Sequence, residues 1–153
     1  MTLRSSKKIL AVSSGGGHWV ELLRLVPAFD GWEVVYATVS EAYRSDIENA
    51  RFHVVRDATR WNWIRLVELA VKLCWVMWSE RPGVVITTGA APGYFALRLG
   101  KLIGARTVWV DSVANVEELS MSGQMAGRYA DLWLTQWAHL ARSNGPHYKG
   151  RVF

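Results

Sequence analysis

Short apolar runs rich in β-branched residues alternate with helical patterns along this chain, and this alternation limits the folds that it can adopt. The runs that predict buried strands lie at residues 9–12, 33–39, 52–56, 84–87, 107–110 and 131–135. Between them, the spacing of apolar residues predicts helices at about 18–26, 41–50, 60–81 and 94–103, and the tail from residue 143 is polar. Strands that alternate with helices favour a parallel sheet with helices on both faces. We therefore predict one α/β domain of Rossmann-like type over residues 1–153.

Length and composition narrow the classes of partner. The 153 residues are half apolar and carry a net charge of +5, which suits an anionic partner such as a membrane surface or a phosphorylated substrate. Cys74 is the only cysteine, which excludes an internal disulfide and a cysteine-rich zinc site and favours a reducing cytoplasm. The first apolar run is interrupted by glycines too early for a signal peptide or a spanning helix, so we expect the chain to begin in the cytosol.

A glycine triplet between the first strand and the first helix is the leading candidate for a binding site. Gly15, Gly16 and Gly17 let the backbone approach a ligand closely, and the free N–H groups of the following helix favour an anion, either a phosphate or a developing oxyanion. His18 comes next and is a candidate general base that would take a proton from a hydroxyl nucleophile. The alternative is a tight turn whose glycines serve packing and whose histidine bonds its own turn.

Two further polar clusters follow later strands. Thr88 and Gly89 come after the strand at 84–87, while Asp111, Ser112 and Asn115 come after the strand at 107–110. Ligands of open parallel sheets bind at the carboxyl ends of the strands, so we expect these clusters to converge with the glycine loop. We assign Thr88, Gly89, Ser112 and Asn115 to substrate binding with the three glycines. Asp111 is a second base, the residue that orients His18, or a cap for the next segment.

The spacing of the glycines, acids and histidines does not match the common nucleotide-binding and metal-binding motifs. Val20 stands where a dinucleotide-binding loop requires its third glycine, and the second strand ends at Val39 rather than at an acid. No Lys-Ser or Lys-Thr follows the glycines, which excludes a phosphate-binding P-loop. His53, His139 and His147 have no spacing that suggests metal ligation, so we expect neither a metal nor a cofactor.

The helix predicted at about 60–81 is too apolar for one side of a sheet. Its polar residues form one narrow stripe, and nearly all other positions are apolar. The chain has nine tryptophans, and four of them in or beside this helix are assigned to a membrane surface or a partner: Trp61, Trp63, Trp75 and Trp78. Glu68 and Lys72 lie mid-segment and would be costly at the centre of a bilayer, so a helix lying in the interface is favoured over a spanning one. Burial against a partner subunit remains an open alternative.

Several motifs of the chain resemble a known family. They are Ser13-Ser14-Gly15-Gly16-Gly17-His18, Thr87-Thr88-Gly89-Ala90 and, within the block from Asp111 to Trp137, Asp111-Ser112, Leu119-Ser120, Ser122-Gly123, Ala130-Asp131 and Gln136-Trp137. The chain is similar to the membrane-associated, acceptor-side subunits of bipartite glycosyltransferases. These include the anchor subunit of the UDP-GlcNAc transferase of asparagine-linked glycosylation and bacterial capsule and exopolysaccharide proteins.

This resemblance implies the fold of the N-terminal domain of a GT-B glycosyltransferase and a function that needs a second chain. A partner would bind the UDP-sugar, and this chain would bind a polyprenyl-diphosphate-linked acceptor at the cytoplasmic face of the membrane. His18 and Asp111 would be the catalytic candidates, and no nucleic acid is involved. The alternatives are a non-catalytic anchor that recruits the partner, and a small nucleotide-binding domain that works alone.

Overall fold

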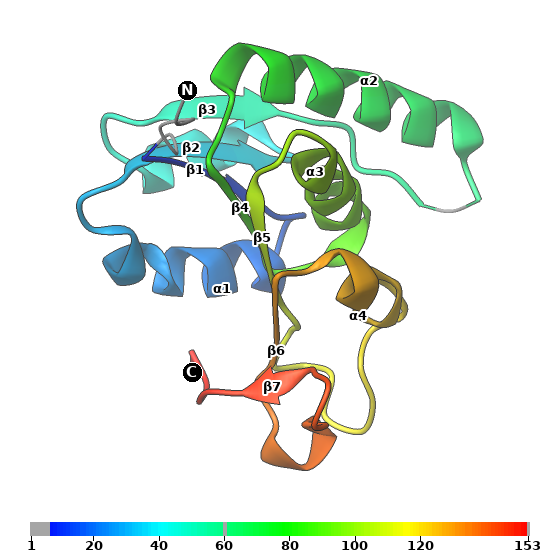
Figure 1. Cartoon of the computed structure of the whole chain (residues 1–153). Coiled ribbons are helices and arrows are strands. Elements are labelled where there is room, and N and C mark those ends of the chain that lie inside the picture. Colours follow the sequence, from blue (N-terminus) through cyan, green and yellow to red (C-terminus); the bar gives the residue numbers. More distant parts are fainter. Residues whose placement is uncertain (1–6, 60, 153) are drawn as a thin grey trace.

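Strands and helices alternate along the computed structural model, which describes residues 7–59 and 61–152 (Figure 1). The strands are β1 (Lys8–Val12), β2 (Glu33–Thr38), β3 (Arg51–Val54), β4 (Val84–Thr87), β5 (Arg106–Val110), β6 (Leu132–Thr135) and β7 (His147–Tyr148). The α-helices are α1 (Gly17–Arg24), α2 (Trp63–Glu80), α3 (Ala90–Leu102) and α4 (Met121–Ala126). Short 3₁₀ helices lie at η1 (Val26–Phe29), η2 (Glu41–Asp46), η3 (Gly127–Tyr129) and η4 (Ala138–Leu140).

All of these strands pair in one parallel sheet, in the order β3-β2-β1-β4-β5-β6-β7. The order reverses between β1 and β4, where Val12 and Thr87 are register partners at the carboxyl ends. The connections that leave these two strands run to opposite faces of the sheet, and ligands of open parallel sheets bind beside such a reversal of strand order. The predicted fold class, a parallel sheet with helices on both faces, is confirmed (Figure 1).

The pleat of β1 explains why helices cover both faces. Leu10 and Val12 belong to one core cluster, with Leu69 and Leu73 of α2. Ile9 and Ala11 belong to the other cluster, together with Trp19 and Leu22 of α1. Since successive side chains of a strand point to opposite faces, a fully apolar strand must be covered twice. The glycine loop and α1 therefore start on one face, while α2 and α3 pack on the other.

The structure differs from the sequence prediction at several elements. The helix expected at 41–50 is only the 3₁₀ helix η2, because the backbone becomes extended at Ile47, which packs on the core beside Trp19. Helix α3 begins at Ala90 rather than near Tyr94, since Pro92 is tolerated in a first turn, where its missing N–H would have no helical acceptor. Helix α4 and strand β7 were not expected. Residue 60, at the start of the predicted tryptophan-rich helix, lies outside the described residues.

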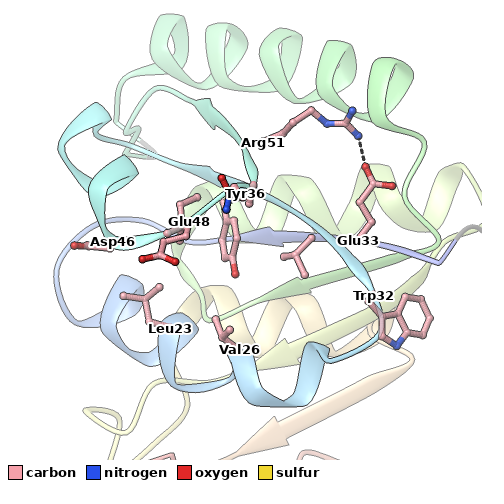
Figure 2. Close-up of a pocket in the computed structure, with 12 residues that line it drawn as sticks. Leu23, Val26, Trp32, Glu33, Tyr36, Asp46, Glu48 and Arg51 are labelled. Carbon is pink, nitrogen blue, oxygen red and sulfur yellow. Dashed lines mark hydrogen bonds and ion pairs between the residues drawn. The ribbon is translucent and has the colours of Figure 1, made fainter.

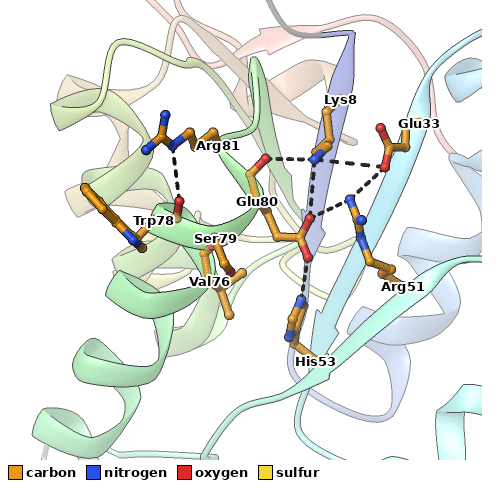
Figure 3. Close-up of polar contacts among 9 residues, drawn as sticks. All are labelled: Lys8, Glu33, Arg51, His53, Val76, Trp78, Ser79, Glu80 and Arg81. Carbon is orange, nitrogen blue, oxygen red and sulfur yellow. Dashed lines mark hydrogen bonds and ion pairs between the residues drawn. The ribbon is translucent and has the colours of Figure 1, made fainter.

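At the amino edge of the sheet, opposite the glycine loop, charged side chains surround Glu80, the last residue of α2 (Figure 3). Glu80 is buried, and its carboxylate accepts hydrogen bonds from Lys8 Nζ at 3.4 Å and forms an ion pair with Arg51 at 2.7 Å. His53 Nε2 lies 3.0 Å from the second carboxylate oxygen. Arg51 also pairs with the exposed Glu33 at 2.7 Å. This cluster fastens the end of α2 to the starts of β1 and β3.

Candidate active site

The glycine loop joins β1 to α1 at the carboxyl edge of the sheet. Gly16 has a φ of 63°, a torsion that glycine adopts without strain, and both Gly16 and Gly17 are exposed. The N–H of Gly16 donates to the Tyr43 hydroxyl at 2.9 Å, so this amide is already engaged. The N–H groups of Gly17 and His18 have no acceptor among the described residues. The loop is therefore open to solvent and presents two free amides at the start of a helix.

His18 is held on the neighbouring strand end. Its Nδ1 lies 2.9 Å from the carbonyl oxygen of Thr88, and the Thr88 hydroxyl donates back to the His18 carbonyl at 2.6 Å. A carbonyl oxygen only accepts hydrogen bonds, so Nδ1 carries the proton and Nε2 has the free lone pair in the neutral ring. Nε2 has no hydrogen-bond partner within residues 7–59 and 61–152, and the side chain is half-buried. This geometry leaves His18 able to accept a proton from a bound hydroxyl.

Gly89 leaves room for the imidazole. Its φ is 128°, and a Cβ at this position would lie 3.1 Å from Cε1 and 3.3 Å from Nδ1 of His18. Its N–H donates to the Thr87 hydroxyl at 3.1 Å. Thr88 thus orients His18 and Gly89 allows its close approach. Direct contact of these two residues with a substrate stays a prediction.

Asp111 is buried and fully hydrogen-bonded within its own segment. Its oxygens accept from the Trp109 indole at 3.1 Å, the Asn115 amide at 3.0 Å, and the Ser120 amide and hydroxyl at 3.1 and 2.6 Å. The neighbouring Ser112 hydroxyl accepts from the amide of Ala114 at 3.2 Å. These contacts fold residues 111–120 into a compact wall beside β5. Asp111 therefore does not orient His18 by hydrogen bonding, because the Thr88 carbonyl has that position.

Three residues of this edge were not assigned from the sequence. Tyr43 caps the glycine loop, while Glu21 and Gln136 are 1% and 2% exposed and contact each other at 2.7 Å. Glu21 lies among the apolar positions of α1, next to the buried Leu22. An acid on the apolar face of a helix is a sequence pattern that could have marked it, because charged side chains are almost never fully buried unless paired. For Gln136, the motif Gln136-Trp137 of the family resemblance is the sequence signal.

A pocket lies away from these residues, beside the start of β2 (Figure 2). A pocket of about 670 Å³ is formed by η1, the start of β2 and residues 46–51, and none of the predicted site residues lines it. Its polar groups are largely engaged: Asp46 accepts from the Trp19 indole at 2.8 Å, and Arg51 pairs with Glu33. Burial raises the pKa of the Tyr36 hydroxyl in its wall. The described residues also contain no group of three or more His, Cys, Asp or Glu that could hold a metal ion.

Helix α2 exposes a broad aromatic surface. Trp61, Trp63 and Trp78 are 82%, 71% and 73% exposed, and Trp75 is 53% exposed, while Leu69, Leu73, Val76 and Met77 of the same helix are buried. The exposed apolar residues Ile64, Val67 and Val71 continue this surface, which we call the α2 aromatic face: Trp61, Trp63, Ile64, Val67, Val71, Trp75 and Trp78. Lys72 and Arg81 lie over the rings of Trp75 and Trp78 at 4.7 and 5.1 Å. No helix in the described part of the chain has the length and hydropathy needed to cross a bilayer.

The fold is shared with solved enzymes of sugar-nucleotide chemistry. MurG from Acinetobacter baumannii aligns with a TM-score of 0.70 at 11% identity, over 94% of this chain and 44% of that one. A UDP-GlcNAc 2-epimerase from Methanocaldococcus jannaschii aligns with a TM-score of 0.63 at 10% identity, over 84% of this chain and 39% of that one. At such identities the likeness shows the fold alone, and it confirms the predicted N-terminal domain of a GT-B glycosyltransferase. The chain spans less than half the length of either structure.

Sequence relatives are closer. The mouse protein "UDP-N-acetylglucosamine transferase subunit ALG14" is 27% identical over 189 residues, covering 99% of this chain and 86% of the mouse protein. The protein of the same name from Yarrowia lipolytica is 35% identical over 79 residues, covering 48% of this chain and 35% of its own length. The family model described as "Oligosaccharide biosynthesis protein Alg14 like" matches residues 47–152, which include the wall built around Asp111 and the buried Gln136. With more than half of its length matched by this model, the chain belongs to the Alg14-like family of oligosaccharide biosynthesis proteins.

Proposed function

We propose that this chain is the acceptor-side subunit of a two-chain glycosyltransferase. It would take part in moving a sugar, with N-acetylglucosamine as the first candidate, from a UDP-sugar to a polyprenyl-diphosphate-linked acceptor in lipid-linked oligosaccharide or polysaccharide biosynthesis. The observation that supports this most is the set of free amides that lies beside an oriented His18 at the carboxyl ends of β1 and β4, where the strand order reverses. The relatives named as transferase subunits support the dependence on a second chain.

The donor side is assigned to the partner. The chain corresponds in fold to the N-terminal part of a GT-B enzyme and spans 44% of the MurG chain. A partner carrying the UDP-sugar would dock over the carboxyl edge of the sheet, because this edge holds the open glycine loop and the unpaired imidazole nitrogen. Sugar transfer would then occur in the cleft between the two chains.

The residues at the carboxyl ends of β1 and β4 suit the transfer of a sugar to a hydroxyl with a histidine as the general base. His18 Nε2 would accept the proton of the acceptor hydroxyl while the new C–O bond forms at the anomeric carbon of the donor sugar. The bond from that carbon to the UDP oxygen breaks, and UDP leaves with the electron pair. The free amides of Gly17 and His18 would lie near the acceptor diphosphate or the developing negative charge. No metal or cofactor is required of this chain's residues in this scheme.

The wall around Asp111 would shape the acceptor site from the other side. Asp111 is committed to Trp109, Asn115 and Ser120, so we assign it a positioning role in preference to that of a second base. Ser112 and Asn115 remain proposed substrate-binding residues on this wall. Gly15 remains a proposed substrate-binding residue because it belongs to the glycine loop. A Cβ at this position would lie 3.0 Å from the Tyr43 hydroxyl oxygen, so a larger residue would crowd Tyr43.

We assign the α2 aromatic face to the cytoplasmic surface of a membrane, where the chain would sit peripherally and meet its lipid-linked acceptor. Indole side chains prefer the interface between headgroups and acyl chains. Basic side chains frame the face, including Arg65 within the helix and Lys72 and Arg81 over tryptophan rings. Cations beside an apolar face favour anionic lipid headgroups. A docked protein would be the occupant instead if the variants described next leave vesicle binding unchanged.

Removal of two indoles from this face should weaken membrane binding. We expect the double substitution Trp63→Ser and Trp78→Ser to lower partitioning onto vesicles of phosphatidylglycerol and phosphatidylcholine by roughly 30- to 900-fold, because each ring contributes apolar burial worth about 1–2 kcal/mol. Sedimentation with sucrose-loaded vesicles measures it. The matched control is Trp32→Ser, a 37% exposed tryptophan on another surface, which should bind like the wild type. Equal binding of the double variant would argue that this face meets a protein.

The assembled pair provides the test of the proposed function. Co-expression with a neighbouring open reading frame of similar size should give a stable complex that transfers sugar from one member of a UDP-sugar panel to a short-chain polyprenyl-diphosphate-linked acceptor. Each chain alone should be inactive, because the cleft needs both. Transfer or tight nucleotide binding by this chain alone would instead support a domain that works by itself.

A further inference from the structure

Glu21 is a buried acid on the helix that carries His18. Its side chain is 1% exposed, and its Oε1 accepts from the Val113 amide and from Gln136 Nε2, both at 2.7 Å. The other oxygen, Oε2, is buried without a hydrogen-bond partner among the described residues. Within residues 7–59 and 61–152, no ion pair joins Glu21 to a cation. The site therefore holds a carboxylate with half of its hydrogen-bonding capacity unused.

Such a group costs folding free energy, because a charge taken out of water needs both a counter-charge and hydrogen bonds to recover its hydration. A leucine would continue the apolar face of α1 at this position, and a glutamine would keep the acceptor for Val113 without burying a charge. The contrast with Glu80 is direct, since the buried Glu80 is surrounded by Lys8, Arg51 and His53. Packing alone does not account for an acid at position 21.

The positions of Glu21 and His18 supply the link to chemistry. Residues three apart on an α-helix have Cβ atoms about 5–6 Å apart, so Glu21 and His18 leave the helix on the same face, about one turn apart. Glu21 also ties this turn to two other strand ends, since Val113 follows β5 and Gln136 follows β6. Gln136 Nε2 additionally donates to the Asp111 carbonyl at 3.1 Å. The N-terminal half of α1 is thus held directly against the Asp111 wall.

We propose that Glu21 is the positioning residue of the acid–base step: its negative charge stabilises the imidazolium that forms when His18 accepts the acceptor's proton, and its hydrogen bonds set the distance of His18 from the Asp111 wall. This inference rests on the proposed glycosyltransferase function. The Thr88 carbonyl selects the proton-bearing nitrogen of His18, and Glu21 supplies the charge. Glu21 acts through His18 and does not touch the substrate.

The test separates charge from structure with two substitutions in the assembled, active pair. Glu21→Gln keeps the shape and an acceptor oxygen but removes the charge, so kcat should fall on the order of 10- to 100-fold with KM within about threefold and Tm within about 4 °C of the wild type. Glu21→Asp keeps the charge but is too short for both hydrogen bonds, so kcat should fall less while Tm falls more. The control Glu33→Gln removes an exposed charge at the opposite edge and should leave kcat and KM unchanged.

The order of the two variants decides the inference. If kcat follows Tm, so that Glu21→Asp is the less active variant, or if Glu21→Gln retains kcat within twofold, Glu21 is only structural and the inference is wrong. A loss that appears in KM alone overturns it as well. If the wild-type pair transfers no sugar, or if its rate is unchanged when His18 is replaced, the proposed function and this inference are both wrong. If the pair is active and depends on His18, but its rate is unchanged when the charge at position 21 is removed, the inference alone is wrong.

Discussion

Substitution of His18 by glutamine should lower kcat of the assembled pair by about 10²- to 10⁴-fold, the range that a general base contributes. Glutamine can donate from its amide to the Thr88 carbonyl, as Nδ1 of His18 does at 2.9 Å, but it has no basic nitrogen for the acceptor hydroxyl. The loss should therefore appear in kcat, with the complex intact and KM within a few-fold of the wild type. Steady-state kinetics with the UDP-sugar that the pair uses measures both constants.

A matched histidine controls for the loss of an imidazole elsewhere. His147 is exposed on β7, and His147→Gln should leave kcat and KM unchanged. Complex formation by the His18 variant is checked by size-exclusion chromatography, so that a failure to assemble is not read as a failure of chemistry. If His18→Gln turns over at the wild-type rate in an intact complex, the chain contributes an anchor and a surface, and the base belongs to the partner.

The second large effect concerns stability. Glu80→Gln should lower the free energy of unfolding by about 2–3 kcal/mol at pH 7, because it removes the carboxylate that Lys8, Arg51 and His53 share. The effect lies below that of a fully enclosed pair, since the Arg51 side chain is 54% exposed and keeps its contact with Glu33. A loss of this size corresponds to a decrease in Tm of roughly 4–12 °C. Urea unfolding followed by circular dichroism measures it.

The same substitution has a defined pH dependence. Burial would by itself raise the pKa of Glu80, but the His53 hydrogen bond and the charges of Arg51, Lys8 and His53 outweigh it and hold the pKa below the ordinary 4.5. A carboxyl whose pKa is lower in the folded state stabilises the fold above its unfolded-state pKa, and this stabilisation is lost as the pH falls through the folded-state pKa. The difference in stability between wild type and Glu80→Gln should therefore be complete at pH 7 and shrink below about pH 4.5.

An exposed pair provides the control for this effect. Glu41 forms an ion pair with Arg44 one turn away on η2, and both side chains are more than half exposed. Glu41→Gln should leave the free energy of unfolding unchanged within experimental error at any pH, because exposed pairs are screened by water and salt. If Glu80→Gln is equally silent, or if its effect persists undiminished at pH 3, the ion-pair cluster does not fasten α2 as the structure indicates.

The sequence by itself determined the fold class, because the pattern of apolar residues in each segment predicts which faces of the strand or helix are buried. Ile9 to Val12 is apolar at every position, which requires helices on both sides of the sheet, and parallel strands then bring their carboxyl ends to one edge. For that reason the positions of Gly16, His18 and Asp111 along the chain were enough to predict that they share one edge of the sheet. The surplus of tryptophans in α2 likewise predicted an exposed aromatic surface, and Trp63 and Trp78 are largely exposed.

Only the tertiary structure decided what each of these side chains contacts. His18 bonds Thr88, 70 residues away, and Glu21 bonds Gln136, 115 residues away; neither spacing has a period that a sequence pattern records. The carboxylate of Asp111 accepts hydrogen bonds from residues of its own segment, and the Thr88 backbone carbonyl orients His18 instead. Every residue has a backbone carbonyl, so the residue type at position 88 does not indicate this role. Periodicity encodes the apolar faces of helices and strands locally, whereas hydrogen-bond partners depend on how those faces are packed together.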